Sequence, residues 1–259
     1  MLCYNVFMSK FEDRMRQMQM SSETSVPLKG YTVLQLDGKA FHTFTRGMGK
    51  PFDKRFMDAM DAVLFELCKQ VGNVKFGFVQ SDEISLLLTD FETPETSMIF
   101  NGRVQKIVST AAGLASAVMA RLYPEKKIFP VFDARVFHVP SSMEVLEWFH
   151  WRQTDCVKNS VSSAGQAVFT SKELQGRNSL EVKDMLLGAG MSWDLLPEGF
   201  KYGRVAVREA VFKTRTRQTG CIVDIDYVQS LQWTVEPAKG MFVEVLLPKI
   251  DVLLEDYIY

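Results

Sequence analysis

The stretch VKFGFVQSDEISLLLT, residues 74–89, decides the fold that the sequence predicts. Two runs rich in β-branched and aromatic residues, 74–80 and 83–89, are separated only by Ser81 and Asp82. Such spacing predicts two strands joined by a tight turn. Polar and acidic residues therefore come together at the tip of an otherwise apolar hairpin.

Segments on both sides of this hairpin complete a pattern of strands and helices. Hydrophobic periodicity predicts four further elements: a strand at 31–36 (YTVLQL), a helix at 53–71, a helix at 97–123 and a strand at 131–139. Asp53 stands where the first helix begins, and an aspartate there accepts hydrogen bonds from free amides of the first turn. The order strand, helix, strand, strand, helix, strand is that of the ferredoxin-like, split βαβ arrangement.

The second half of the chain predicts more helix and then more strand. The expected elements are a helix that a capping box at 141–144 starts and that ends near residue 169, a helix at 179–187, and strands with a turn at 202–226. No linker rich in Pro, Gly or Ser separates the halves. We therefore expect an α+β protein with a palm-like catalytic region at residues 1–140 and a helical and β-rich extension at 141–259, packed together as one unit.

Composition sets limits on the function. The 259 residues are 47% hydrophobic and 24% charged, and 30 basic residues against 31 acidic ones give a net charge of −1. Nucleic-acid binding would therefore need a local basic patch rather than a basic surface overall. No apolar run reaches the roughly 18 residues of a membrane span. The four cysteines lie far apart with no His at metal-ligand spacing, which predicts free thiols, no zinc site and a cytoplasmic protein.

Two acids stand at corresponding points of the predicted sheet. Asp37 ends the first strand and Asp82 lies in the hairpin turn. In a split βαβ sheet these strands are neighbours, so we expect the two carboxylates to converge, whereas strand alternation would point Glu83 to the opposite face. Converging hard oxygen ligands suit Mg²⁺. The alternative is that Asp37-Gly38 is only a turn dipeptide and Asp82-Glu83 only a solvated hairpin tip.

Basic and polar residues suggest contacts with phosphates. A basic loop follows the first acid, and it lacks the spacing of a Walker phosphate loop. Lys213, Arg215 and Arg217 alternate along one strand, as an RNA-binding patch or as charge protection of a sheet edge. A polar stripe that includes Arg152 and Asn159 follows one helix, facing either a groove or simply solvent.

Five motifs occur in order along the chain: LDGKAFHTFTR (36–46), QSDEISLLL (80–88), FDARVFHVPS (132–141), WRQTDCVKNSV (151–161) and KTRTRQ (213–218). Together they resemble the tRNA(His) guanylyltransferase family of 3′–5′ polymerases. The resemblance covers most of the chain and implies a polymerase-type palm that works in the reverse chemical direction.

The resemblance also implies roles for individual residues. Asp37 and Asp82, with the carbonyl of Gly38, would hold two Mg²⁺ ions, and Glu83 would be needed for activity. Nucleotide contacts are implied for Asp37, Gly38, Lys39, Ala40, Phe41, His42, Lys50, Asp53, Ser81 and Asp82. Contacts with a second triphosphate or the RNA 5′ end are implied for Arg103, Lys106 and Arg152, and we add Asn159 and the strand residues Lys213, Arg215 and Arg217 as candidates.

The implied substrates are tRNA and nucleoside triphosphates. ATP or GTP would activate the RNA 5′-monophosphate, and the 3′-hydroxyl of an incoming nucleotide would then attack the activated end. Eukaryotic guanylyltransferases carry His-Ile-Asn-Asn-Leu-Tyr-Asn where this chain has VKNSVSS at 157–163, and Gln35 replaces a family Arg. The sequence therefore resembles the bacterial guanylyltransferase-like branch, for which we expect template-dependent repair of 5′-truncated tRNA by a homotetramer.

Three other functions stay open at this point. The protein could add a single 5′ G to tRNA(His), as a guanylyltransferase in the strict sense. It could be a palm-type nucleotide cyclase, which would work without RNA. It could also be an RNA-binding protein that has lost catalysis, although the presence of all three acids argues against this.

Overall fold

The hairpin at 74–89 lies at the centre of a six-stranded antiparallel sheet with the strand order β4-β1-β3-β2-β5-β6. This computed structural model describes residues 2–219 and 222–238, without the side chains of 2–9 and 209–231. The strands are β1 Tyr31–Gly38, β2 Val74–Gln80, β3 Glu83–Thr89, β4 Phe132–Val139, β5 Arg204–Thr219 and β6 Ile222–Pro237. All four strands expected in the first half are therefore confirmed.

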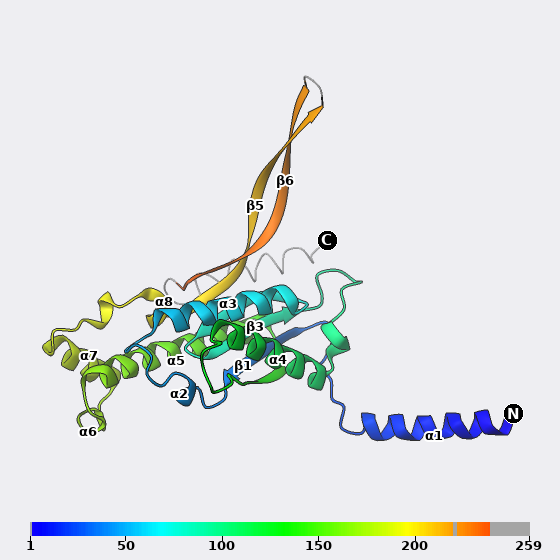
Figure 1. Cartoon of the computed structure of the whole chain (residues 1–259), viewed down its shortest axis with the longest axis horizontal. Helices are drawn as coiled ribbons and strands as arrows, with labels where there is room; N and C mark the ends of the chain where they lie inside the picture. The colour runs from blue at the N-terminus through cyan, green and yellow to red at the C-terminus, as the bar shows by residue number, and fades with distance from the viewer. Residues whose placement is uncertain (1, 220–221, 239–259) are drawn as a thin grey trace.

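Helices cover both faces of the sheet (Figure 1). On one face, α3 (Lys54–Gln70) and α4 (Val104–Leu122) pack on alternate residues of the strands, such as Leu34 and Leu36 of β1. On the other face, α5 (Ser142–Val168) packs on Val33 and the residues that alternate with the first set. Each strand of the centre is therefore apolar on both sides, which is why the strands read as continuous hydrophobic runs.

Of the two helices predicted between the strands of the first half, α3 begins where expected and α4 begins later. Asp53 caps α3 as expected, because its Oδ1 accepts a hydrogen bond from the Phe56 amide at 3.0 Å. The helix expected from residue 97 instead begins at Val104. Phe100 and Asn101 have φ angles of 52° and 54°, and this left-handed backbone interrupts the helix with a short 3-10 turn, η1 (Ile99–Gly102).

Helix α5, which opens the second half, packs against the sheet. Ser141 caps α5 by accepting a hydrogen bond from the Glu144 amide at 3.3 Å. Beyond α5 the chain forms four short elements: α6 Ser171–Leu174, α7 Ser179–Gly188, η2 Trp193–Leu195 and α8 Glu198–Lys201. Helix α7 and Trp193 pack on the end of α5 and form a third apolar cluster.

Two elements extend away from this body. Figure 1 shows helix α1 (Leu2–Met20) lying apart from the sheet and the β5–β6 hairpin rising from it. The sequence placed strands at 202–226, whereas β6 continues to Pro237. Within the described residues, none of the helices has the length and apolar character that crossing a membrane requires.

Candidate active site

The turn of the central hairpin brings Asp82 to the end of β1. Ser81 has a φ of 45°, a left-handed conformation that lets the chain reverse within two residues. The Gly38 amide donates a hydrogen bond to the Asp82 carbonyl oxygen at 3.2 Å, which ties the turn to β1. Asp37 and Asp82 therefore lie side by side although they are distant in the chain.

Gly38 is required at this point for steric reasons. A Cβ atom there would lie 2.5 Å from the ring of Phe41 and 2.9 Å from Oδ2 of Asp82. No side chain fits between these groups. At the Asp37-Gly38 dipeptide the backbone therefore lies close to the second acid, Asp82, so the dipeptide is more than a simple turn.

The acids line a cavity of about 340 Å³, here called the acid cavity. The wall from the sheet contributes Asp37, Gln80, Ser81, Asp82 and Glu83, and the wall from α5 contributes Asn159, Ser162, Ser163 and Gln166. Negative charge from the hairpin thus faces neutral hydrogen-bonding side chains of α5.

Burial and mutual repulsion perturb the two carboxylates. Burial, together with the negative charges of Asp82, Glu83 and Asp133, raises the pKa of Asp37 to about 6, while Arg135 opposes the shift. Burial also raises the pKa of Asp82, against hydrogen bonds from its own backbone and from Ser81. A cluster of acids that resist ionisation in the absence of a counter-charge is suited to a divalent cation.

The acids alone do not complete a metal shell. Across residues 2–219 and 222–238, no group of three or more His, Cys, Asp or Glu side chains could hold a metal ion. A cation between Asp37 and Asp82 would therefore need further oxygens from backbone, water or substrate. Mg²⁺ accepts this arrangement, because it usually keeps several waters and takes only one or two carboxylates.

Glu83 does not point away from Asp82, which corrects the expectation from strand alternation. Asp82 belongs to the turn, and the strand begins only at Glu83, so alternation does not relate the two residues. Glu83 is instead the register partner of Asp37 across β1 and β3, and partners in an antiparallel pair share a face. All three acids consequently line the same cavity.

Arg152 is engaged by these acids rather than free for RNA. Its Nε and Nη2 donate hydrogen bonds to the two oxygens of Glu83 at 2.8 and 2.9 Å, and Nη2 also donates to Asp155 at 2.7 Å. Only 8% of the Arg152 side chain and 14% of the Glu83 side chain are exposed. The geometry places Arg152 behind the cavity as the counter-charge of Glu83.

A second cavity, of about 240 Å³, lies beside the first and is here called the loop cavity. Its lining comes mainly from the loop before α3 and the start of that helix, and includes Lys50 and Asp53. The Asp53 carboxylate is held by the amides of Gly49 and Phe56, which lower its pKa. Lys50 is exposed at the rim.

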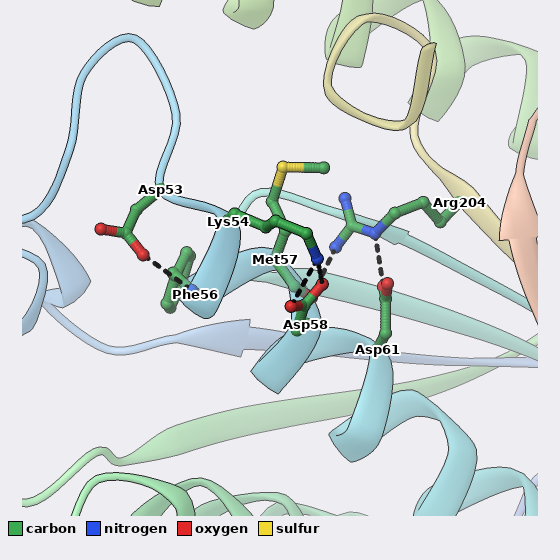
Figure 2. A network of polar contacts seen from close by, with 7 residues as sticks. All are labelled: Asp53, Lys54, Phe56, Met57, Asp58, Asp61 and Arg204. Carbon is green, nitrogen blue, oxygen red and sulfur yellow. Dashed lines mark hydrogen bonds and ion pairs between the residues drawn. The ribbon is translucent and has the colours of Figure 1, made fainter. Parts of the chain in front are cut away.

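Arg204 contributes to the wall of the loop cavity and joins three elements. Figure 2 shows its guanidinium directed towards Asp61. Its Nε donates a hydrogen bond to Oδ1 of Asp61 on α3, and Nη1 donates to the Gly199 carbonyl oxygen at 3.1 Å. Arg204 is 5% exposed. The pair fixes β5 and α8 against α3, so it supports the cavity from behind.

The remaining predicted nucleotide residues divide into two groups. Lys39, Ala40 and His42 are exposed on the loop that follows Asp37. The Phe41 side chain is 3% exposed and packs on Phe44, Phe56 and Phe132 in the core, so it cannot stack on a nucleotide. Only the backbone of Phe41 is available for such a contact.

Basic residues expected at the RNA lie elsewhere. Arg103 and Lys106 stand at the start of α4 and contact Phe100, and neither lines the two cavities. Asn159 does line both cavities. The side chains of the remaining candidates on β5 fall outside the described residues: Lys213, Arg215 and Arg217.

The predicted site did not include Asp133 or Gln80, which both lie close to the acids. Asp133 is the register partner of Asp37 on β4, and its position in the FDARVF motif was the available signal. Gln80 lines both cavities and is 2% exposed. A polar residue at the end of an otherwise apolar strand could have indicated it.

Comparisons with known proteins show the family to which the chain belongs. The family model for tRNAHis guanylyltransferase matches residues 12–140. The tRNA(His) guanylyltransferase of Debaryomyces hansenii is 30% identical over 204 residues, which are 69% of this chain and 74% of that protein.

Solved structures show the same likeness. A bacterial tRNA(His) guanylyltransferase-like protein in complex with ATP has a TM-score of 0.80 and 28% identity, over 96% of this chain and all of that one. Its complex with GTP has a TM-score of 0.78 and 27% identity, with the same coverage. For the Saccharomyces cerevisiae tRNA(His) guanylyltransferase the TM-score is 0.64 and the identity 25%, over 73% of this chain and 90% of that one.

The antiparallel α+β fold is shared with a solved guanylyltransferase-like protein, and together with the match to the tRNAHis guanylyltransferase family model it shows a nucleotidyltransferase. The chain belongs to the tRNA(His) guanylyltransferase family.

Proposed function

We propose that this protein extends tRNA at its 5′ end in the 3′–5′ direction, as a metal-dependent repair enzyme for 5′-truncated tRNA. The observation that carries the proposal is the convergence of Asp37 and Asp82 on one cavity. The sheet that holds them would be a ferredoxin-like, polymerase-type palm at residues 1–140, to which the extension at 141–259 adds α5 as the opposite wall.

The donor set fits Mg²⁺, because two carboxylates with raised pKa values face a cavity with room for substrate oxygens. Asp37 and Asp82, with the Gly38 carbonyl, would hold the ions. When bound, the cations would acidify an attacking hydroxyl and balance the charge of the phosphates.

The chain's own residues position the reactants. Asp37 and Asp82 are fixed by the β1–β3 pairing and by the hydrogen bond between Gly38 and the turn. Arg152 balances the charge of Glu83 and does not itself line the acid cavity. The loop cavity beside the acids would receive the nucleotide, and the likeness to a protein solved with ATP and with GTP supports either nucleotide as the activating substrate.

Repair is preferred over the addition of one G to tRNA(His). The likeness to the bacterial guanylyltransferase-like protein extends over nearly the whole chain, whereas that to the yeast enzyme covers 73% of it. Residues 157–163 also differ from the eukaryotic motif at the wall that faces the acids. We further propose a cytoplasmic homotetramer, as is common in the family.

The test uses the full chain with Mg²⁺, ATP, GTP and a labelled tRNA that lacks its first nucleotide. We expect growth at the 5′ end by the nucleotide that pairs with the opposite base. The variants Asp37→Ala and Asp82→Ala should lose the activity. Asp58→Ala, at a side chain 60% exposed and outside both cavities, should keep it and serves as the matched control.

The outcomes separate the alternatives. Addition of G only, and only to tRNA(His), would instead indicate a guanylyltransferase in the strict sense. A cyclic or dinucleotide product formed without RNA would indicate a cyclase. Binding of tRNA without incorporation of any nucleotide would refute the catalytic proposal.

A further inference from the structure

Gln80 is buried without a partner. It is the last residue of β2 and 2% exposed, yet neither Oε1 nor Nε2 has a hydrogen-bond partner among the described residues. Buried amides are normally satisfied, because an unpaired donor or acceptor loses its hydration without compensation. The side chain therefore carries an unsatisfied donor group and an unsatisfied acceptor.

The position of Gln80 indicates which part of a bound molecule would pair with this amide. It lines both the acid cavity and the loop cavity, and so do four other side chains: Ser81, Asn159, Ser163 and Gln166. All five are neutral and can form hydrogen bonds. The two cavities thus meet at a neutral, polar junction.

The cavities on either side of this junction differ in chemistry. The acid cavity carries three carboxylates and is suited to phosphates with their cations. The loop cavity is lined by apolar side chains that suit a planar base: Met48, Phe52, Phe56, Met57 and Phe200. A nucleotide joins phosphate to base through its ribose, so the ribose would occupy the junction.

We propose that Gln80 binds the ribose hydroxyls of the nucleotide and so selects ribonucleotides over deoxyribonucleotides, with Asn159 on the opposite wall. This inference rests on the proposed function. A carboxamide offers a donor and an acceptor in one plane, and a vicinal diol can accept from one and donate to the other. An acidic side chain at this position would repel the acids and the phosphates, and a basic one would pair with the acids. A neutral amide does neither.

The test compares Gln80→Met with the wild type, by calorimetric titration of the full chain with ATP, 2′-deoxy-ATP and 3′-deoxy-ATP in Mg²⁺. We expect the wild type to bind ATP about tenfold more tightly than 2′-deoxy-ATP, which is the worth of one or two hydrogen bonds. Gln80→Met should bind ATP and that analogue alike. Gln70→Met, at an exposed glutamine of α3, should behave as the wild type.

Thermal unfolding of the nucleotide-free proteins separates a ligand-binding role from a structural one. Because methionine removes an unpaired buried amide, Gln80→Met should unfold at the same temperature as the wild type or at a higher one. A lower unfolding temperature together with an unchanged preference for ATP would overturn the inference, and so would an equal loss of affinity for ATP and both deoxy analogues. If the wild type bound no nucleotide at all, the proposed function would fail, and the inference with it.

Discussion

Replacing Arg152 with methionine should destabilise the protein strongly, although the sequence suggested a surface contact with RNA. Methionine keeps much of the apolar stem but removes the guanidinium. Glu83 then loses a bidentate partner and remains 14% exposed beside Asp37 and Asp82, without a counter-charge. The change therefore adds an uncompensated negative charge to a cluster that already resists ionisation.

The magnitude follows from burial. Removing one partner of a buried ion pair costs about 3–5 kcal/mol, and we take about 3 kcal/mol because Glu83 borders a cavity that admits water. A surface arginine that only contacted RNA would cost about 0.5 kcal/mol or less. For a domain of this size, about 3 kcal/mol corresponds to a decrease in unfolding temperature of roughly 6–12 °C.

Urea unfolding at pH 7, without divalent cations, measures this difference. Glu83→Gln should cost less than Arg152→Met, because Arg152 keeps Asp155 and the amide oxygen as acceptors. The double variant then gives a coupling energy for the pair. The reasoning would be refuted by an Arg152→Met variant with wild-type stability and weakened tRNA affinity, since that result describes an RNA contact.

Further predictions concern the acids, the glycine beside them and the β hairpin. Gly38→Ala should destabilise the protein by more than about 2 kcal/mol in urea unfolding, because the added Cβ would lie within 3 Å of Phe41 and Asp82. Gly113→Ala is the control in α4: its Cβ would meet nothing within 4 Å, so this change should stabilise the protein by about 0.5–1 kcal/mol. The pKa of Asp37 is raised to about 6, so without cations its contribution to stability is present at low pH and is lost as the pH rises through about 6. Asp37→Asn should therefore raise the unfolding temperature at pH 8 and abolish Mn²⁺ binding, and wild-type Mn²⁺ affinity should fall as the pH is lowered through 6, because protons compete for the carboxylate. A flatter salt dependence of tRNA affinity, measured by filter binding, is expected when three basic residues of β5 are neutralised together: Lys213, Arg215 and Arg217.

Local patterns in the sequence determined most of the elements. The alternation of strand residues, the apolar stripe of α3 and the cap at Asp53 depend on neighbours within a few positions. They predicted the central hairpin and the helices on either side of it. The five sequence motifs indicated the family. The late start of α4 was not predicted, because the left-handed backbone at Phe100 and Asn101 occurs at residues other than glycine.

The chemistry of the site was settled only by tertiary structure. Strand pairing places Glu83 opposite Asp37. The Phe41 ring packs in the core and is not available to a nucleotide. The position of α5 lets Arg152 form an ion pair with Glu83. Gln80 could be recognised as unpaired only once its surroundings were known. Such contacts join residues far apart in the chain, and the charge, burial and partners of a side chain depend on those contacts rather than on its sequence neighbours.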